Sequence, residues 1–163
     1  MKKSASGTVA RYGLLIGLAM VLSWLESLVP VLPVPGMKLG LTNLVVLVAL
    51  YRMGPGPAVG INLVRILLVS MTFGNAFSLW YSAAGGVLSG LVMLLLHKSG
   101  RFGPAAVSAA GGVAHNVGQI LVAMAVLQTA GLVWYLCVLW FSGIAAGLIL
   151  GLLCSQVLRR LPE

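Results

Sequence analysis

A small set of polar and ionisable side chains interrupts the otherwise apolar stretches of this chain, and these residues are its candidates for chemistry. Ionisable groups are costly in a hydrocarbon environment, so they normally face a partner or a water-filled cavity. An arginine can hold a phosphate or a carboxylate through two parallel hydrogen bonds, and amides or a histidine can orient a bound group. The candidate binding residues are Glu26, Lys38, Asn43, Asn62, Arg65, His115, Asn116 and Gln119.

The charges of this set predict the sign of the ligand. One carboxylate, Glu26, cannot neutralise Lys38, Arg65 and a protonated His115 together. A surplus of positive charge around a cavity favours an anionic solute. Two alternatives stay open for Glu26, which either contacts a cationic group of the ligand or only offsets Arg65 and Lys38. For the amides the competing interpretation is that they tie helices together.

The same composition argues against catalysis. Chemistry on a diphosphate needs Mg²⁺ held by several carboxylates, and the chain contains two acidic residues, Glu26 and Glu163, with no aspartate. It also has no Walker A sequence for binding ATP. We therefore expect neither an enzyme nor a metal or cofactor site, and active transport would require separate ATPase subunits.

The elements that must position these residues are membrane-spanning helices. Hydrophobic residues make up 60% of the 163 residues, and the mean hydropathy of +1.09 is far above that of soluble domains. About 20 apolar residues span a bilayer as a helix. The whole chain, residues 1–163, is therefore predicted to form a single all-α, polytopic transmembrane domain.

Proline and glycine clusters divide the chain into six expected helices. The second and third of these are short for a full crossing, which favours tilt, local thinning of the bilayer or non-helical backbone buried against neighbours. The expected helices cover residues 12–32, 38–51, 57–73, 76–96, 103–128 and 132–158.

The basic residues predict the orientation of the bundle. The formal net charge is +8, and lysine and arginine in short loops favour the cytoplasmic side. Six helices with both termini in the cytoplasm place nearly all of these charges on that side, where they also attract anionic lipid headgroups. No nucleic-acid-binding motif is present, so nucleic acid is not an expected partner. The residues assigned to the cytoplasmic side are Lys2, Lys3, Arg11, Arg52, Lys98, Arg101, Arg159 and Arg160.

Small residues recur every four positions on several expected helices and lay smooth stripes on one helix face. The favoured interpretation is close packing within the bundle, and the alternative is docking against another membrane protein. Gly13 and Gly17 on the first helix are the best docking candidates, because that helix is expected to be peripheral. The other stripes are Ser78, Ser82, Gly86 and Gly90; Ala106, Ala110, Ala114 and Gly118; and Gly143, Gly147 and Gly151.

Three segments carry a resemblance to a known family. Residues 35–43 (PGMKLGLTN), 81–86 (YSAAGG) and 114–119 (AHNVGQ) resemble signature segments of the bacterial Gx transporter family, which is also called heptaprenyl diphosphate synthase component I. The resemblance extends from about Tyr12 to Leu158. The chain is also similar to the wider class of S components of energy-coupling factor transporters.

The resemblance implies a function as well as a fold. S components are six-helix bundles in the bacterial plasma membrane that bind a vitamin or precursor from outside. They dock onto a transmembrane coupling protein that carries two ATPases, through small residues on the first helix, for which Gly13 and Gly17 are the nearest match here. This predicts a substrate-binding subunit for a small anionic vitamin or isoprenoid-type precursor.

Two other functions remain as alternatives. The family's second name favours a non-catalytic membrane subunit linked to heptaprenyl diphosphate synthase or quinone metabolism, with a cytoplasmic binding surface around Arg52, Lys98 and Arg101. A self-sufficient ion-coupled carrier is disfavoured, because Glu26 is the only carboxylate within an expected span.

Overall fold

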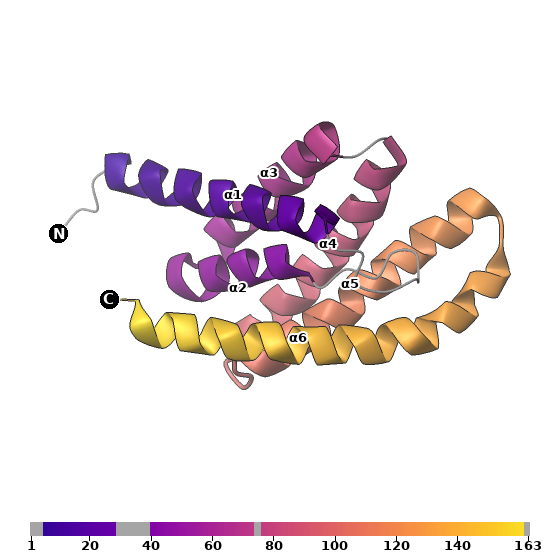
Figure 1. Ribbon diagram of the computed structural model, residues 1–163. Coiled ribbons are helices and arrows are strands. Elements are labelled where there is room, and N and C mark those ends of the chain that lie inside the picture. Colours follow the sequence, from indigo (N-terminus) through magenta and orange to yellow (C-terminus); the bar gives the residue numbers. More distant parts are fainter. Residues whose placement is uncertain (1–4, 29–39, 74–75, 162–163) are drawn as a thin grey trace.

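The protein is a bundle of α-helices (Figure 1). The computed structural model describes residues 5–28, 40–73 and 76–161, and this part of the chain contains helices and no strand, which confirms the all-α class. The helices are α1 (Ala5–Leu28), α2 (Leu41–Met53), α3 (Pro55–Phe73), α4 (Ala76–Lys98), α5 (Pro104–Leu127), a short 3₁₀ helix η1 (Ala130–Trp134) and α6 (Tyr135–Arg160).

Helix length and composition make the chain a multi-pass membrane protein. Five helical stretches of the described chain are long and apolar enough to cross a membrane. The exception is α2, whose 13 residues rise only about 20 Å at 1.5 Å per residue, against a hydrocarbon core of about 30 Å. The second helix is therefore short, as expected from the sequence, whereas the third, which was also expected to be short, is long enough to cross because it begins at Pro55.

The short helix α2 forms the centre of the bundle. It packs against α1, α3 and α6, and every residue from Val45 to Leu50 is buried. A helix that is apolar all round can be buried inside a bundle or face lipid, and α2 is the buried kind. The rest of the core, including Ile61 of α3 and Val107 of α5, gathers around it.

Glycines in the left-handed half of backbone space delimit α2. Gly40, directly before the helix, has φ 74°, and Gly54, directly after it, has φ 92°. Side chains other than glycine rarely adopt such angles. The turn at Gly54 lets α3 begin at Pro55, so the two helices follow each other without a loop.

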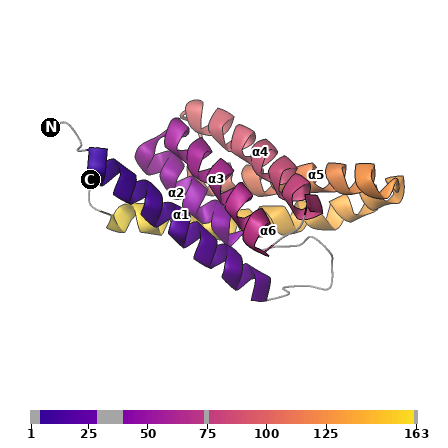
Figure 2. The ribbon, with the colours of Figure 1, turned by 90° about the horizontal axis from the view of Figure 1, so that it is seen from above.

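The helices α5 and α6 form a hairpin whose backbones touch. A Cβ atom at Gly143, Gly147 or Gly151 of α6 would lie within 3.0 Å of α5 backbone atoms. Glycine stripes permit such close approach in membrane bundles. The α5–α6 hairpin extends beyond the other helices in both Figure 1 and Figure 2. The favoured interpretation of the α6 stripe, packing within the bundle, is confirmed.

The first helix is peripheral, as expected. α1 contacts α2 and α3, but only 6% of the residues in its most apolar stretch, within Ser6–Glu26, are buried. Figure 2 shows it crossing the outside of α2 and α3. A Cβ atom at Gly13 or Gly17 would meet nothing within 4 Å, so these glycines are not needed for packing within the chain.

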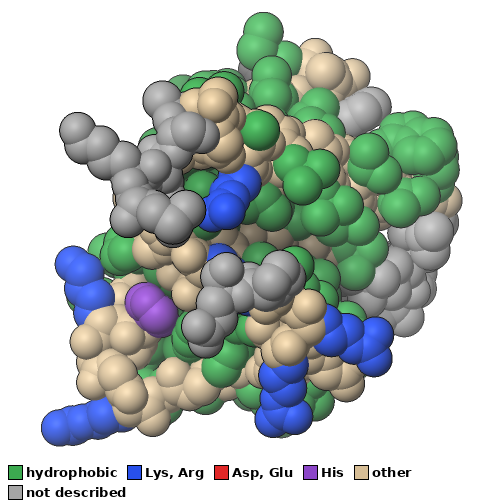
Figure 3. Space-filling model, turned by 90° about the vertical axis from the view of Figure 1, so that its left-hand side faces the viewer, with side chains coloured by type: hydrophobic (Ala, Val, Ile, Leu, Met, Phe, Trp, Pro, Cys, Tyr) green, Lys and Arg blue, Asp and Glu red, His purple; other side chains and the backbone are tan. Residues whose placement is uncertain are grey.

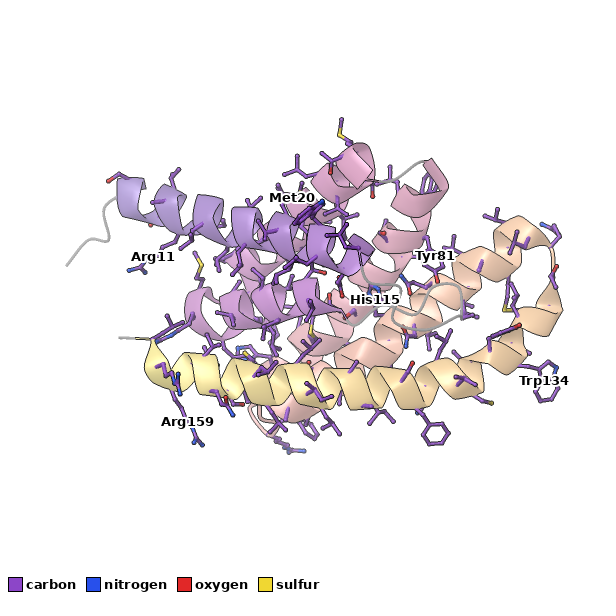
Figure 4. The ribbon with its side chains drawn as sticks, viewed as in Figure 1. Arg11, Met20, Tyr81, His115, Trp134 and Arg159 are labelled. Atoms are coloured by element: carbon purple, nitrogen blue, oxygen red, sulfur yellow. The ribbon has the colours of Figure 1, made fainter. Side chains whose placement is uncertain are left out.

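One end of the bundle is basic, and we call it the basic end. It contains the first turns of α1, the last turns of α6 and the α2–α3 and α4–α5 connections (Figure 1). Arg11 and Arg159 both lie there, far from Trp134 at the opposite end (Figure 4). Figure 3 views the molecule from this end and shows lysine and arginine side chains around it. Arg52 donates a hydrogen bond to the Leu161 carbonyl oxygen, which ties α2 to the end of α6.

Most predicted helix boundaries differ from the structure by a residue or more, and three helix starts differ by three residues or more. The first helix begins at Ala5, before the predicted residue 12, because no proline precedes that point to stop it. The second begins at Leu41, since Gly40 has a left-handed conformation. Residues 130–134 form the 3₁₀ turn η1, and the α-helical part of the last helix begins only at Tyr135. Residues 29–32 and 38–39, which were also assigned to helices, lie outside the described residues.

Candidate functional site

A polar cavity lies where α1 to α5 converge, in the half of the bundle opposite the basic end. Its volume is about 50 Å³, which corresponds to about four waters at the roughly 10–15 Å³ that each requires. A phosphate or carboxylate group is of this size. The lining residues are Ser23 and Glu26 of α1, Gly40, Thr42 and Asn43 at the start of α2, Arg65, Ile66 and Val69 of α3, Ser82 of α4, and His115 and Gln119 of α5.

Arg65 is the buried cation of this cavity. It is 8% exposed. Its Nη1 donates a hydrogen bond to Thr42 Oγ1 at 2.6 Å, and its Nη2 donates one to Asn62 Oδ1 at 2.7 Å. Its Nε is buried and has no hydrogen-bond partner within the described chain. A guanidinium has five N–H donors in a fixed plane, so two neighbours hold Arg65 in place while it keeps donor capacity for an anion.

Glu26 links the end of α1 to the start of α2. Its Oε1 accepts a hydrogen bond from the backbone N–H of Leu41 at 2.8 Å. The first N–H groups of a helix have no partner inside the helix and favour a negative charge. The carboxylate also interacts electrostatically with Arg65. Glu26 therefore caps α2 and lies close enough to Arg65 for their charges to interact.

His115 and Gln119 face the cavity from successive turns of α5. Gln119 is almost fully buried, and Figure 4 shows His115 inside the bundle, away from both ends. Both side chains lie against Gly85 of α4, where a Cβ atom would come within 2.9 Å of His115 Cε1 and of Gln119 Cγ. The glycine at position 85 makes the room in which these two side chains reach the cavity.

Two of the predicted binding residues are engaged elsewhere. Asn62 does not line the polar cavity; it accepts the bond from Arg65 and donates one to the Gly86 carbonyl oxygen at 3.0 Å, so it positions the arginine. Asn116 points to α6 and donates a hydrogen bond to the Leu139 carbonyl oxygen at 2.6 Å. Its neighbour His115 faces the cavity because adjacent helical residues point about 100° apart. For Asn116 the structure thus favours the competing interpretation, in which an amide side chain ties two helices together.

The structure adds residues that the sequence reasoning did not select. Thr42 precedes Asn43 in the same segment and is the hydrogen-bond acceptor for Arg65. Ser23 and Ser82 also line the cavity; Ser82 had been assigned to a packing stripe, and nothing in the spacing of Ser23 distinguishes it. The predicted ligand contact Lys38 lies outside the described residues.

The chemistry of the cavity is that of a binding site. It combines one buried guanidinium, one carboxylate, one imidazole, two amides and three hydroxyls. The described residues contain no group of three or more His, Cys, Asp and Glu residues that could hold a metal ion. Hydrogen-bond donors around a buried cation suit an anion of phosphate or carboxylate size.

The model of the family described as heptaprenyl diphosphate synthase component I matches residues 15–157. The chain belongs to this family. The match includes every residue that lines the polar cavity. No curated protein and no solved structure matches the chain.

The apolar helices of this family member extend through most of the matched region. Its sequence has no aspartate, so the diphosphate chemistry in the family's name would require carboxylates from another polypeptide.

Proposed function

We propose that this chain is the substrate-binding membrane subunit of a transporter of the energy-coupling-factor type. It captures a small anionic solute, a vitamin or an isoprenoid-type precursor, from outside the plasma membrane of a bacterium. A transmembrane coupling protein and separate ATPase subunits supply the energy for release to the inside. Both termini, and with them the basic end of the bundle, lie in the cytoplasm.

The observation that carries the proposal is Arg65 in the polar cavity. A guanidinium that is 8% exposed among apolar helices is expensive, and such residues mark ligand pathways. Hydrogen bonds to Thr42 and Asn62 fix its orientation before any ligand arrives, which lowers the cost of ordering on binding. The cavity lies in the half opposite the basic end, which is the outer half if basic residues are cytoplasmic.

The surface of α1 supports the proposed docking onto a transmembrane coupling protein. Its outward surface is apolar, with Leu14 72% exposed and Val9 70% exposed. Gly13 and Gly17 leave the backbone of this surface open. Small residues allow two membrane helices to approach closely, so this face suits the coupling protein.

The family name supports one alternative, a non-catalytic accessory subunit of heptaprenyl diphosphate synthase. That role would use the basic end, where Arg52, Lys98 and Arg101 lie, and would not need a cavity in the opposite half. Gentle purification from native membranes separates the two. Co-purifying ATPase subunits support the transporter, and a co-purifying soluble synthase supports the accessory role.

Substitutions at Arg65 and Asn116 test the binding site itself. Arg65→Ala removes the cavity's cation, and we expect at least a tenfold loss of the small molecule retained in a native mass spectrum. Asn116→Ala removes a buried hydrogen bond to Leu139 and should lower the free energy of unfolding by about 1–3 kcal/mol while the molecule stays bound. A folded Arg65→Ala variant that retains the molecule as the wild type does would contradict the proposal.

A further inference from the structure

An apolar groove runs between α2, α3 and α4 directly beside the polar cavity. Its volume is about 310 Å³, which lies at the lower end of the range for ligand sites. Its rim is formed by Leu63, Val87 and Leu91, which are between 47% and 55% exposed on the outer surface of the bundle. The groove therefore opens sideways, toward the hydrocarbon of the membrane.

The groove and the polar cavity share a thin boundary. Asn62 lines the groove and accepts the hydrogen bond from Arg65 Nη2 at 2.7 Å. Gly86 also lines the groove, and a Cβ atom there would lie 2.5 Å from Ile66 Cδ1 and 3.6 Å from Arg65 Nη2. Ile66 in turn lines the polar cavity. The Ile66 side chain, which packs against Gly86, and the amide of Asn62 thus separate the Arg65 guanidinium from the groove.

We propose that the ligand is a single-chain anionic amphiphile, with its headgroup at Arg65 and its hydrocarbon chain in the groove between α3 and α4. This rests on the proposed function and narrows its substrate class. The chain passes between the two spaces where Ile66 meets Gly86. Rotation of the Ile66 side chain joins them, because Gly86 has no side chain to block the passage.

Charge and size select this occupant. The buried cation in the cavity attracts an anionic head, and the groove beside it offers only apolar side chains apart from Asn62. The groove volume of 310 Å³ is about six times the 50 Å³ of the polar cavity, so the groove has room for one hydrocarbon chain beside the head. The acyl chains of the bilayer are as apolar as the groove. What the groove adds to the affinity of the head is therefore close packing against a chain that fits it, and transfer out of the lipid adds little.

The test compares two probes, decyl phosphate and inorganic phosphate, on the full chain in nanodiscs of zwitterionic phosphatidylcholine. We expect the wild type to bind decyl phosphate at least tenfold more tightly. Val87→Trp places an indole at the groove rim, and Leu95→Trp is its control on the same lipid-facing side of α4, since Leu95 is 60% exposed and does not line the groove. Val87→Trp should bring decyl phosphate to the affinity of inorganic phosphate, and Leu95→Trp should leave both affinities unchanged.

The outcomes separate this inference from the proposed function. If Val87→Trp and Leu95→Trp bind decyl phosphate with equal affinity, the hydrocarbon chain does not occupy the groove. The anion site at Arg65 is left intact by that result. Binding of both probes that survives in Arg65→Gln overturns the anion site itself. Nanodiscs that contain phosphatidylglycerol add a two-chain anionic lipid. Unchanged decyl phosphate affinity in them supports a single-chain occupant, and competition by that lipid overturns it.

Discussion

At the scale of single residues, the site depends on how one arginine is held. Arg65 donates to Thr42 and Asn62 from its two terminal nitrogens, and these acceptors belong to α2 and to its own helix. Hydrogen bonds to a charged group contribute about 1.5–3 kcal/mol each when both partners are well placed. The arginine is thus fixed across two helices, and its orientation does not depend on a ligand.

Glu26 gives a prediction that distinguishes its two possible roles. Glu26→Gln keeps an oxygen acceptor for the Leu41 N–H but removes the negative charge beside Arg65. Because the carboxylate opposes an anion in the same cavity, the variant should bind an anionic ligand about two- to tenfold more tightly, which corresponds to about 0.4–1.4 kcal/mol for one charge pair in a water-like dielectric. The dissociation constant of decyl phosphate or of the co-purifying molecule measures this.

Weaker binding by Glu26→Gln would instead show that the carboxylate contacts a cationic group of the ligand. Glu26→Ala provides the structural control. It removes the cap of α2 as well, so its free energy of unfolding should fall by about 0.5–2 kcal/mol, whereas the glutamine variant should stay close to the wild type.

At the scale of helices, glycine determines how closely elements approach. The α6 glycines lie against the backbone of α5, with a Cβ atom at Gly147 only 2.5 Å from the Ser108 carbonyl oxygen and 2.6 Å from Ala109 Cα. Backbone atoms cannot move aside as the end of a long side chain can. The α5–α6 pair therefore tolerates little added volume, and α5 carries both His115 and Gln119.

Gly147→Ala should separate α5 from α6. We expect a loss of about 1–3 kcal/mol in the free energy of unfolding, which is typical of overpacking. Gly60→Ala is the matched control in α3, where a Cβ atom meets nothing within 4 Å, and alanine's better helix propensity should stabilise the protein by up to about 1 kcal/mol. Denaturant unfolding in mild detergent compares the two, and equal stabilities would contradict this account of the α5–α6 contact.

At the scale of the whole molecule, α1 is the least buried of the described helices that are long enough to span a membrane. Only 6% of the residues in its most apolar stretch are buried, yet its side chains Ser23 and Glu26 line the polar cavity. An element that covers the ligand and also faces outward can transmit binding to a partner. A coupling protein seated on α1 would therefore sense the occupied cavity directly.

The docking surface is tested by adding side chains where the fold has room. Gly13→Leu combined with Gly17→Leu should leave the unfolding temperature unchanged, because no described atom lies near either Cβ position. It should reduce co-purification of the coupling protein at least tenfold, since leucines keep the helix backbones apart. Gly60→Leu in α3 is the control with the same open surroundings, and equal co-purification by the two variants would argue against docking on α1.

Much of the fold could be predicted from the sequence. Apolar composition and the glycine and proline breaks indicated a helical membrane bundle, because each span must satisfy its backbone hydrogen bonds internally. The short α2 and the peripheral α1 were also expected. The predicted start of α2 was wrong because Gly40 has a left-handed conformation, and glycine adopts left- and right-handed angles about equally readily, so its residue type does not reveal which one occurs.

The sequence by itself determined which side chains were expensive in the membrane, and so singled out Glu26, Asn43, Arg65, His115 and Gln119, all of which line the polar cavity. Only the tertiary structure decided that Asn116 binds α6, that Asn62 holds Arg65, and that an apolar groove lies beside the cation. The physical reason is that the free-energy cost of placing a polar side chain in the membrane follows from the residue type alone. The direction of a side chain, and what it meets there, depends on the rotation and neighbours of its helix.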